Sequence, residues 1–203
     1  MAEAQSVKVL YFDVTGLGEI LRLLLKFAGK EFEDVRLDRD KWPEIKPTMP
    51  FGQVPVLELD GKRYGQSVAL ASYLAREFGF YGKTNLEALT IDTVYQLQSD
   101  LLHGYAKYYR ETDPVKKEEY LKEVKSEIGP RYLGFFENLL KESGTGFFVG
   151  DSITLADIVL FDVATGFLKP TVEDSIDNFL LVKKLVETVG EDERIKQYVS
   201  ERK

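Results

Sequence analysis

One tyrosine stands out among the side chains of this sequence that could do chemistry. Tyr11 closes an apolar run near the start of the chain, and Gly16 and Gly18 follow it closely. A tyrosine hydroxyl has a pKa near ~10, so at neutral pH it donates a hydrogen bond that could stabilise a neighbouring anion. Most strand tyrosines pack in a core, however, and the pattern by itself favours a structural role for Tyr11.

The rest of the composition limits which other chemistry the chain can supply. There is no cysteine, which excludes disulfides, thiolate metal sites and redox chemistry carried by a protein thiol. The single histidine, His103, has no companion ligands at metal-binding spacing, so we interpret it as structural and expect no metal. Any thiol chemistry must therefore come from a ligand.

Charge and hydropathy exclude further classes of protein. The formal net charge of -7 repels a phosphate backbone, so we expect no nucleic-acid partner. No apolar run approaches membrane-spanning length, and the first residues lack a signal-peptide pattern, so we expect a cytoplasmic protein without a membrane partner. A chain of 203 residues with 44% hydrophobic content suits one large domain or two small ones.

The elements that must position Tyr11 alternate quickly in the first third of the chain. Apolar patterns predict strands at 7–12, 32–37, 54–59 and 62–64 and helices at 20–29 and 67–78. The proline-rich stretch from Trp42 to Gly52 is predicted to be a turn. The order βαβ followed by ββα matches the thioredoxin fold, although order alone also fits other small α/β units.

Beyond Gly82 the sequence has helical periods only. Long helices are predicted at 86–109 and 115–140, with a kink or break at Gly129-Pro130. Thr154 and Asp157 form a capping-box pattern that starts another helix. The segment from Phe80 to Asn85 is the best linker. We therefore predict an α/β thioredoxin-like domain at 5–82 and an all-α domain at 84–203.

Several short motifs, taken in order, resemble those of the cytosolic glutathione transferases, in the sigma class or its nematode relatives. They are Tyr11 after the first strand, Trp42-Pro-Glu-Ile-Lys46, Pro50-Phe-Gly-Gln-Val-Pro55-Val-Leu, Gln66-Ser67 and Ser152-Ile-Thr-Leu-Ala-Asp157. The resemblance covers almost the whole chain. It implies a thioredoxin-like domain that binds glutathione as co-substrate, a helical domain that forms the electrophile pocket, and a homodimer.

The resemblance makes Tyr11 the catalytic residue of a glutathione transferase of the EC 2.5.1.18 type. A free thiol with a pKa near ~8.5 is only a few per cent thiolate at neutral pH, and the thiolate is the nucleophile. A bond from the Tyr11 hydroxyl to sulfur would favour the charged form. Lowering the thiol pKa costs about 1.4 kcal/mol per unit, so two units are within reach of one such bond plus a helix N-terminus.

Other positions match the family residues that hold glutathione. The resemblance places Trp42 and Lys46 at the glycyl carboxylate, with Gln53 beside the same ligand. It places the backbone of Val54 against the cysteinyl part, before a Pro55 that is cis in the family. The sequence does not decide between a cis and an ordinary trans proline.

The glutamyl end of glutathione is assigned to a helix start and to a second subunit. Gln66 and Ser67 precede a predicted helix, where Ser67 is also a good N-cap, and the resemblance places the glutamyl carboxylate there. It also implies that Asp100 of the partner subunit reaches the glutamyl amine. Phe51 matches a position that plugs the partner in several classes, so it is the candidate dimer contact.

The candidate second-substrate pocket is apolar and aromatic. Its residues are Phe12, Leu17, Leu102, Tyr105 and Tyr108. An aromatic cluster of this kind is more often packing between domains. Vertebrate sigma enzymes that isomerise prostaglandin H2 carry an arginine at the position of Leu17 and a tryptophan at that of Lys107. They also have acids for a bridging metal where this chain has Gln96 and Ser99, which again predicts no metal.

Three classes of function follow from these residues. The leading hypothesis is conjugation of glutathione to small hydrophobic electrophiles, as in detoxification. The alternatives are a glutathione-dependent isomerase of the prostaglandin H2 type and a non-catalytic carrier of hydrophobic ligands such as haem. A scaffold protein of the same fold would be expected to lose Tyr11, Gln66 or Ser67, and all three are present.

Overall fold

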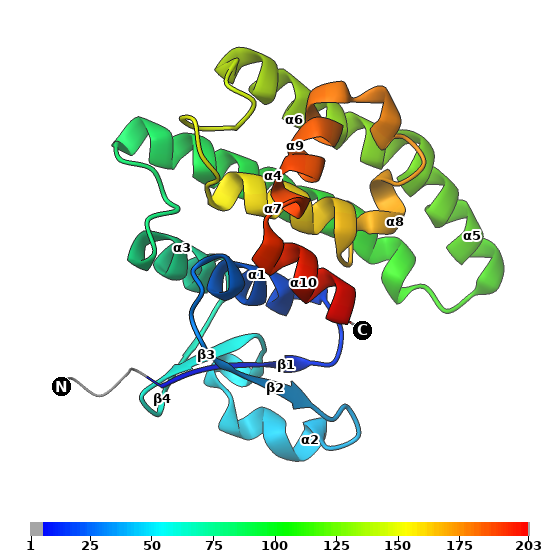
Figure 1. The fold of residues 1–203 in the computed structure, drawn as a ribbon. Helices are drawn as coiled ribbons and strands as arrows, with labels where there is room; N and C mark the ends of the chain where they lie inside the picture. The colour runs from blue at the N-terminus through cyan, green and yellow to red at the C-terminus, as the bar shows by residue number, and fades with distance from the viewer. Residues whose placement is uncertain (1–5, 203) are drawn as a thin grey trace. The chain divides into compact units, whose positions relative to one another are not determined.

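The protein divides into two compact units, which we describe separately. The computed structural model describes residues 6–202. The first unit is Met1–Gly79 together with Asp192–Lys203, and the second is Phe80–Glu191. The ribbon in Figure 1 follows the chain from one terminus to the other.

The first unit is built on a four-stranded sheet in the order β2-β1-β3-β4. Strand β1 pairs in parallel with β2 and antiparallel with β3, and β3 continues through a tight turn into β4. Helices α1 and α3 lie on one face and the short α2 on the other (Figure 1). The bounds are β1 Val7–Phe12, α1 Glu19–Phe27, β2 Glu33–Leu37, α2 Trp42–Ile45, β3 Val56–Leu59, β4 Lys62–Gly65 and α3 Ser67–Glu77. The predicted thioredoxin-like fold is confirmed.

The proline-rich stretch is more ordered than the predicted turn. It contains α2 and two turns of 3-10 helix, Lys46–Thr48 and Pro50–Gly52. Prolines stand in the first turn of all three pieces, where a missing N–H costs nothing. Strand β3 begins at Val56, later than predicted, because Pro55 has no N–H to give to the sheet.

The last helix, α10 (Glu193–Glu201), groups with the first unit, although the sequence assigned it to the helical domain. Its Ile195 is fully buried, and the Arg194 guanidinium donates to the carbonyl of Phe27 at the end of α1. Tyr198 and Arg202 both bond to Glu19 at the start of α1. An amphipathic pattern shows that a helix has a buried face, but not what covers that face.

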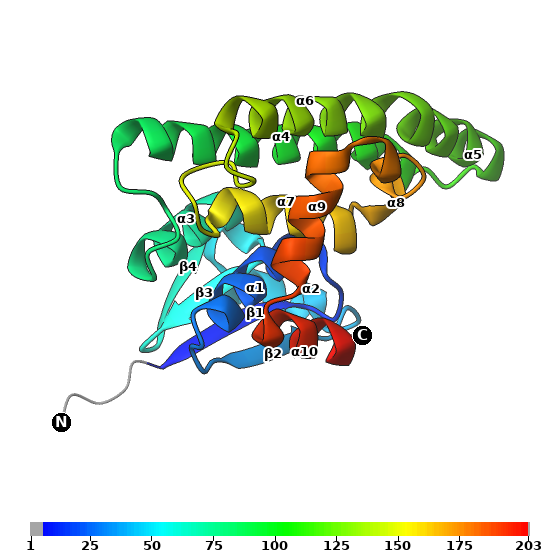
Figure 2. The same ribbon diagram turned by 45° about the horizontal axis from the view of Figure 1, so that its top comes forward.

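The second unit is all helical and is organised around α7, whose residues are nearly all buried. Helices α4 and α9 pack against α7, and Figure 2 shows α4 and α6 side by side. The helices are α4 Asn85–Arg110, α5 Pro114–Glu123, α6 Gly129–Ser143, α7 Leu155–Thr165, α8 Lys169–Val172 and α9 Leu180–Gly190. None of the described helices is both long and apolar enough to cross a membrane.

The structure bears on two local predictions in the second unit. The kink or break predicted at Gly129-Pro130 lies just after an irregular turn: a π-helical turn, Val124–Ile128, joins α5 to α6, and Gly129 is the first residue of α6. A side chain at Gly129 would collide with the carbonyl oxygen of Thr171, so α8 can approach only a glycine. Thr154 and Asp157 form the predicted capping box of α7.

Candidate active site around Tyr11

The hydroxyl of Tyr11 is placed by the chain that follows its strand. Tyr11 pairs in register with Arg36 of β2, one residue before the end of β1. The chain then turns through a 3-10 helix, Gly16–Gly18, into α1. The backbone N–H of Leu17 in that turn donates to the Tyr11 hydroxyl oxygen at 3.1 Å. The hydroxyl thus lies beside the N-terminal end of α1.

Two glycines allow this turn to close on the tyrosine. A Cβ on Gly16 would lie 2.6 Å from the Tyr11 hydroxyl oxygen, and one on Gly18 would lie 2.6 Å from ring atoms. Both distances are far inside van der Waals contact. The glycines that broke the sequence pattern are therefore required by the close packing of the turn on the ring.

Contacts are defined for several of the predicted glutathione residues, and one of these contacts joins Gln53 to Gln66. The Trp42 ring meets the Phe12 ring edge-on, with centroids 5.3 Å apart, and packs on the core around Leu10. Lys46 is exposed, and its aliphatic chain lies beside Gly52. The amide of Gln66 donates to the side-chain oxygen of Gln53 at 3.4 Å.

The start of α3 differs from the prediction in one detail. The N-cap is Gln66, with a φ of 79°, and Ser67 is the first helical residue, so the prediction of Ser67 as N-cap is wrong. The reason is the left-handed backbone of Gln66, which ends β4 and starts the helix within one residue. The Val54–Pro55 peptide is cis, the isomer that the sequence left open.

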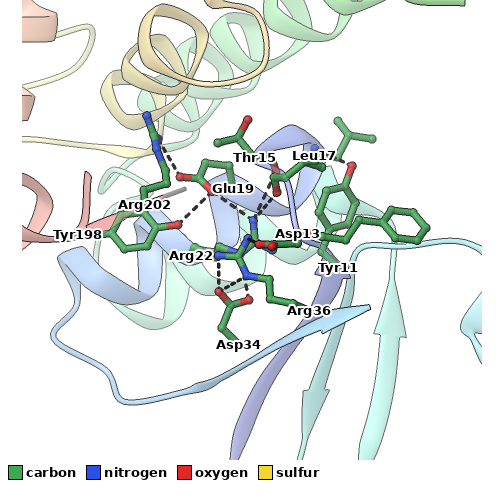
Figure 3. Close-up of polar contacts among 12 residues, drawn as sticks. Tyr11, Asp13, Thr15, Leu17, Glu19, Arg22, Asp34, Arg36, Tyr198 and Arg202 are labelled. Carbon is green, nitrogen blue, oxygen red and sulfur yellow. Dashed lines mark hydrogen bonds and ion pairs between the residues drawn. The ribbon is translucent and has the colours of Figure 1, made fainter. Parts of the chain in front are cut away.

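Sequence reasoning missed a buried cluster of charges behind Tyr11. Glu19 and Arg22 in α1 are both fully buried, and Figure 3 shows them between Asp34 of β2 and the C-terminal Tyr198 and Arg202. Burial opposes the charge on Arg22, but Asp34 and Glu19 outweigh it and hold its pKa above the usual value. An acid and a base three residues apart, with leucine and isoleucine around them, were the available signal.

The candidate residues of α4 lie in the second unit. Asp100 is exposed and accepts a 3.4 Å bond from Gln96, while Leu102 and Tyr108 are half-buried. Tyr105 is 5% exposed, its ring 5.3 Å from that of Phe167, and burial raises its pKa to about 12. His103 bonds within its own helix, to the Ser99 carbonyl. Among residues 6–202 no cluster of acids and histidines could hold a metal.

Two family descriptions match this chain. Residues 7–76 match the glutathione S-transferase N-terminal domain, and residues 99–202 match the glutathione S-transferase C-terminal domain. Glutathione S-transferase 1 of Ascaris suum is 38% identical over 198 residues, which is 96% of each chain.

Solved structures of similar proteins cover 98% of this chain and 98% of their own. A Nu-class glutathione S-transferase of Haemonchus contortus is 34% identical, with a TM-score of 0.88. Prostaglandin synthase D of Nilaparvata lugens is 34% identical, with a TM-score of 0.89. A monomeric glutathione S-transferase of the hookworm Necator americanus is 37% identical, with a TM-score of 0.84.

Proposed function

This chain belongs to the cytosolic glutathione S-transferase family and is a transferase of the EC 2.5.1.18 type, and on that premise we propose that Tyr11 activates the thiol of glutathione. The observation that carries the proposal is the bond from the Leu17 N–H to the Tyr11 hydroxyl oxygen. A hydroxyl that accepts such a bond becomes a better donor, because hydrogen bonds in a chain polarise one another. Its own O–H can then stabilise a thiolate.

The proposed reaction uses that thiolate as a nucleophile. The sulfur lone pair forms a C–S bond to an electrophilic carbon, and in a substitution the leaving group departs with its electron pair. In an addition to an enone the electrons move to the carbonyl oxygen and the product takes up a proton. Tyr11 lowers the barrier by keeping the sulfur ionised at neutral pH.

Seven further residues are proposed to hold glutathione. The contact between Gln53 and Gln66 and the nearby N-terminus of α3 support a site for the glutamyl carboxylate, since a helix N-terminus favours an anion. The exposed ammonium of Lys46 suits the glycyl carboxylate. The proposed set is Trp42, Lys46, Gln53, Val54, Gln66 and Ser67, with Asp100 of the partner subunit.

The electrophile pocket is proposed to be lined by Phe12, Leu17, Leu102, Tyr105 and Tyr108. Their side chains are apolar or aromatic, which suits small hydrophobic electrophiles. We propose conjugation in detoxification as the physiological role. Similarity to prostaglandin synthase D of Nilaparvata lugens keeps the isomerisation of prostaglandin H2 as a second candidate. Leu17, in place of the arginine of the vertebrate isomerases, favours conjugation.

A homodimer is also part of the proposal. Phe51 is 75% exposed, and Tyr64 of β4 and Val68 and Tyr73 of α3 add exposed apolar surface in the same unit. Apolar surface of this kind is a feature of interfaces between subunits. The similar hookworm protein is a monomer, so the oligomeric state of this chain needs a sedimentation measurement. The sigma class and the cytoplasmic location stay predictions.

Replacement of Tyr11 by phenylalanine tests the proposed function. We expect Tyr11→Phe to lower kcat/KM with a chromogenic electrophile by about a hundredfold, because one charge-assisted donor is lost at the developing thiolate. Retention on immobilised glutathione should persist, since the binding residues remain. Full activity in this variant would refute the role of Tyr11, and wild-type protein without any turnover would favour the carrier.

A further inference from the structure

The loop that follows Tyr11 is held from behind by one guanidinium. Arg22 donates from Nη1 to the carbonyl of Val14 at 2.9 Å and from Nη2 to that of Phe12 at 3.3 Å. Its guanidinium carbon also lies 5.7 Å from the centre of the Tyr11 ring. Arg22 therefore fixes both the loop that leads to Leu17 and one side of the ring.

The guanidinium is itself fixed by carboxylates from two elements. Glu19 lies one turn earlier in α1, and its Oε2 accepts from Arg22 Nη1 at 3.2 Å. Asp34 of β2 accepts from Arg22 Nε at 3.0 Å. Asp34 is shared with Arg36, which also lies 3.4 Å from Asp13. Two carboxylates, Glu19 and Asp34, thus bond directly to the Arg22 guanidinium.

The carboxylate of Glu19 is completed by the far end of the chain. The Tyr198 hydroxyl donates to Oε2 at 3.1 Å, and Arg202 Nη1 donates to Oε1 at 2.8 Å. Glu19 has no exposed surface, and the Arg202 side chain is 10% exposed. Figure 3 shows both C-terminal side chains pointing at Glu19 from one side, with Arg22 on the other.

A buried ion cluster of this kind is a poor device for stability alone. Removing each ion from water carries a large free-energy cost, so packed apolar residues of similar volume often stabilise a fold equally well. The cluster nevertheless gives fixed directions to its members, because Arg22 is a planar fork with several donors. A constraint on direction is useful where one hydroxyl must stay in place, since an error of ~1 Å can cost about a hundredfold in rate.

We propose that the C-terminal helix α10 positions the catalytic tyrosine, with Tyr198 and Arg202 orienting Glu19, Glu19 orienting Arg22, and Arg22 holding the loop around Tyr11. The inference rests on the proposed function of Tyr11. Glu19, Arg22, Tyr198 and Arg202 are positioning residues and do not touch glutathione. Loss of the C-terminal contacts loosens the Leu17 N–H, which weakens the donor that Tyr11 offers to sulfur.

The test removes the two C-terminal donors and keeps most of their packing. In the double variant Tyr198→Phe, Arg202→Gln we expect the pKa of the bound glutathione thiol to rise by about half a unit to one unit. It is read from the pH dependence of kcat/KM and from thiolate absorbance of the enzyme–glutathione complex. We expect kcat/KM at pH 6.5 to fall by about threefold to tenfold, with KM for glutathione unchanged within about twofold.

Two further variants separate positioning from simple anchoring. Arg194→Gln removes the bond between α10 and the Phe27 carbonyl and leaves Glu19 untouched, so it should lower the Tm without moving the pH profile. Arg202→Lys keeps a cation beside Glu19 and should restore most of the wild-type profile when combined with native Tyr198. If the double variant and Arg194→Gln both change only the Tm, α10 is an anchor and the inference is wrong.

Comparison with Tyr11→Phe keeps the two proposals apart. If Tyr11→Phe leaves the thiol pKa at its wild-type value, the proposed role of Tyr11 fails. If Tyr11→Phe raises that pKa and the double variant does not, the role of Tyr11 stands and only the positioning by α10 is refuted.

Discussion

The two units each bury a carboxylate, and they satisfy it in opposite ways. Asp157 in the second unit accepts from the N–H of Phe148 and from the N–H and hydroxyl of Thr154, all close in sequence. Glu19 in the first unit accepts from Arg22, one turn away, and from Tyr198 and Arg202 at the other end of the chain. Both side chains are fully buried.

The difference separates a folding signal from a positioning device. The partners of Asp157 are uncharged groups near the start of α7, and burial raises its pKa. Its contacts form wherever that helix forms. The partners of Glu19 are mainly charged, and they meet only after the chain has folded. Residues at the C-terminal end of the chain therefore fix the position of the Glu19 side chain in α1. We expect changes at Asp157 to affect stability and changes around Glu19 to affect the chemistry.

Loss of the Asp157 carboxylate should give the largest effect, a loss of stability in the second unit. Asp157→Ala leaves buried N–H groups of Phe148 and Thr154 unpaired and removes the cap of α7, so we expect the free energy of unfolding to fall by about 3 kcal/mol. Urea unfolding of the variant and of the wild-type protein measures this difference in the free energy of unfolding. Exposed Asp151→Ala is the matched control and should cost little. A changed thiol pKa in the remaining folded protein would contradict the separation drawn above.

A methyl group beside Tyr11 should give a smaller effect, which we expect in activity as well as in stability. Gly18→Ala brings a Cβ within 2.6 Å of the Tyr11 ring, while its φ of -83° suits alanine. The ring must shift, and we expect kcat/KM to fall by about tenfold. Gly134→Ala is the matched control, because its Cβ would meet only a ring carbon of Phe179 at 3.8 Å. Equal activity of both variants would show that the position of the ring matters little.

The smallest expected effect concerns alkaline stability of the second unit. Burial raises the pKa of Tyr105 to about 12, so between pH ~10 and ~12 the unfolded chain loses a proton that the folded protein keeps. This stability is complete below pH ~10 and is lost as the pH rises through ~12. The free energy of unfolding of the wild-type protein should fall between pH 8 and pH 11, and Tyr105→Phe should lessen this fall by about 1 kcal/mol, measured by urea unfolding. An unchanged decline would mean that the hydroxyl is not effectively buried.

Much of the fold could be predicted from the sequence because it depends on short spacings. Patterns that span only a few residues predict the strand at Val7–Phe12, the apolar face of α1 and the Thr154–Asp157 capping box. Local hydrogen bonds and side-chain periodicity fix such elements before any long-range contact forms. The same local motifs identified the family, and with it the expected role of Tyr11.

What the sequence by itself determined is therefore the four strands, most of the longer helices, the order of these elements and the tyrosine near the end of β1. The tertiary structure decided that Gln66, with a left-handed backbone, occupies the N-cap position of α3, that α10 belongs with the first unit, and that Glu19 and Arg22 are buried behind Tyr11. The physical reason is that a charged side chain is stable inside a protein only when it is paired with partner groups. Two partners of Glu19 come from the other end of the chain, so its burial depends on the tertiary structure.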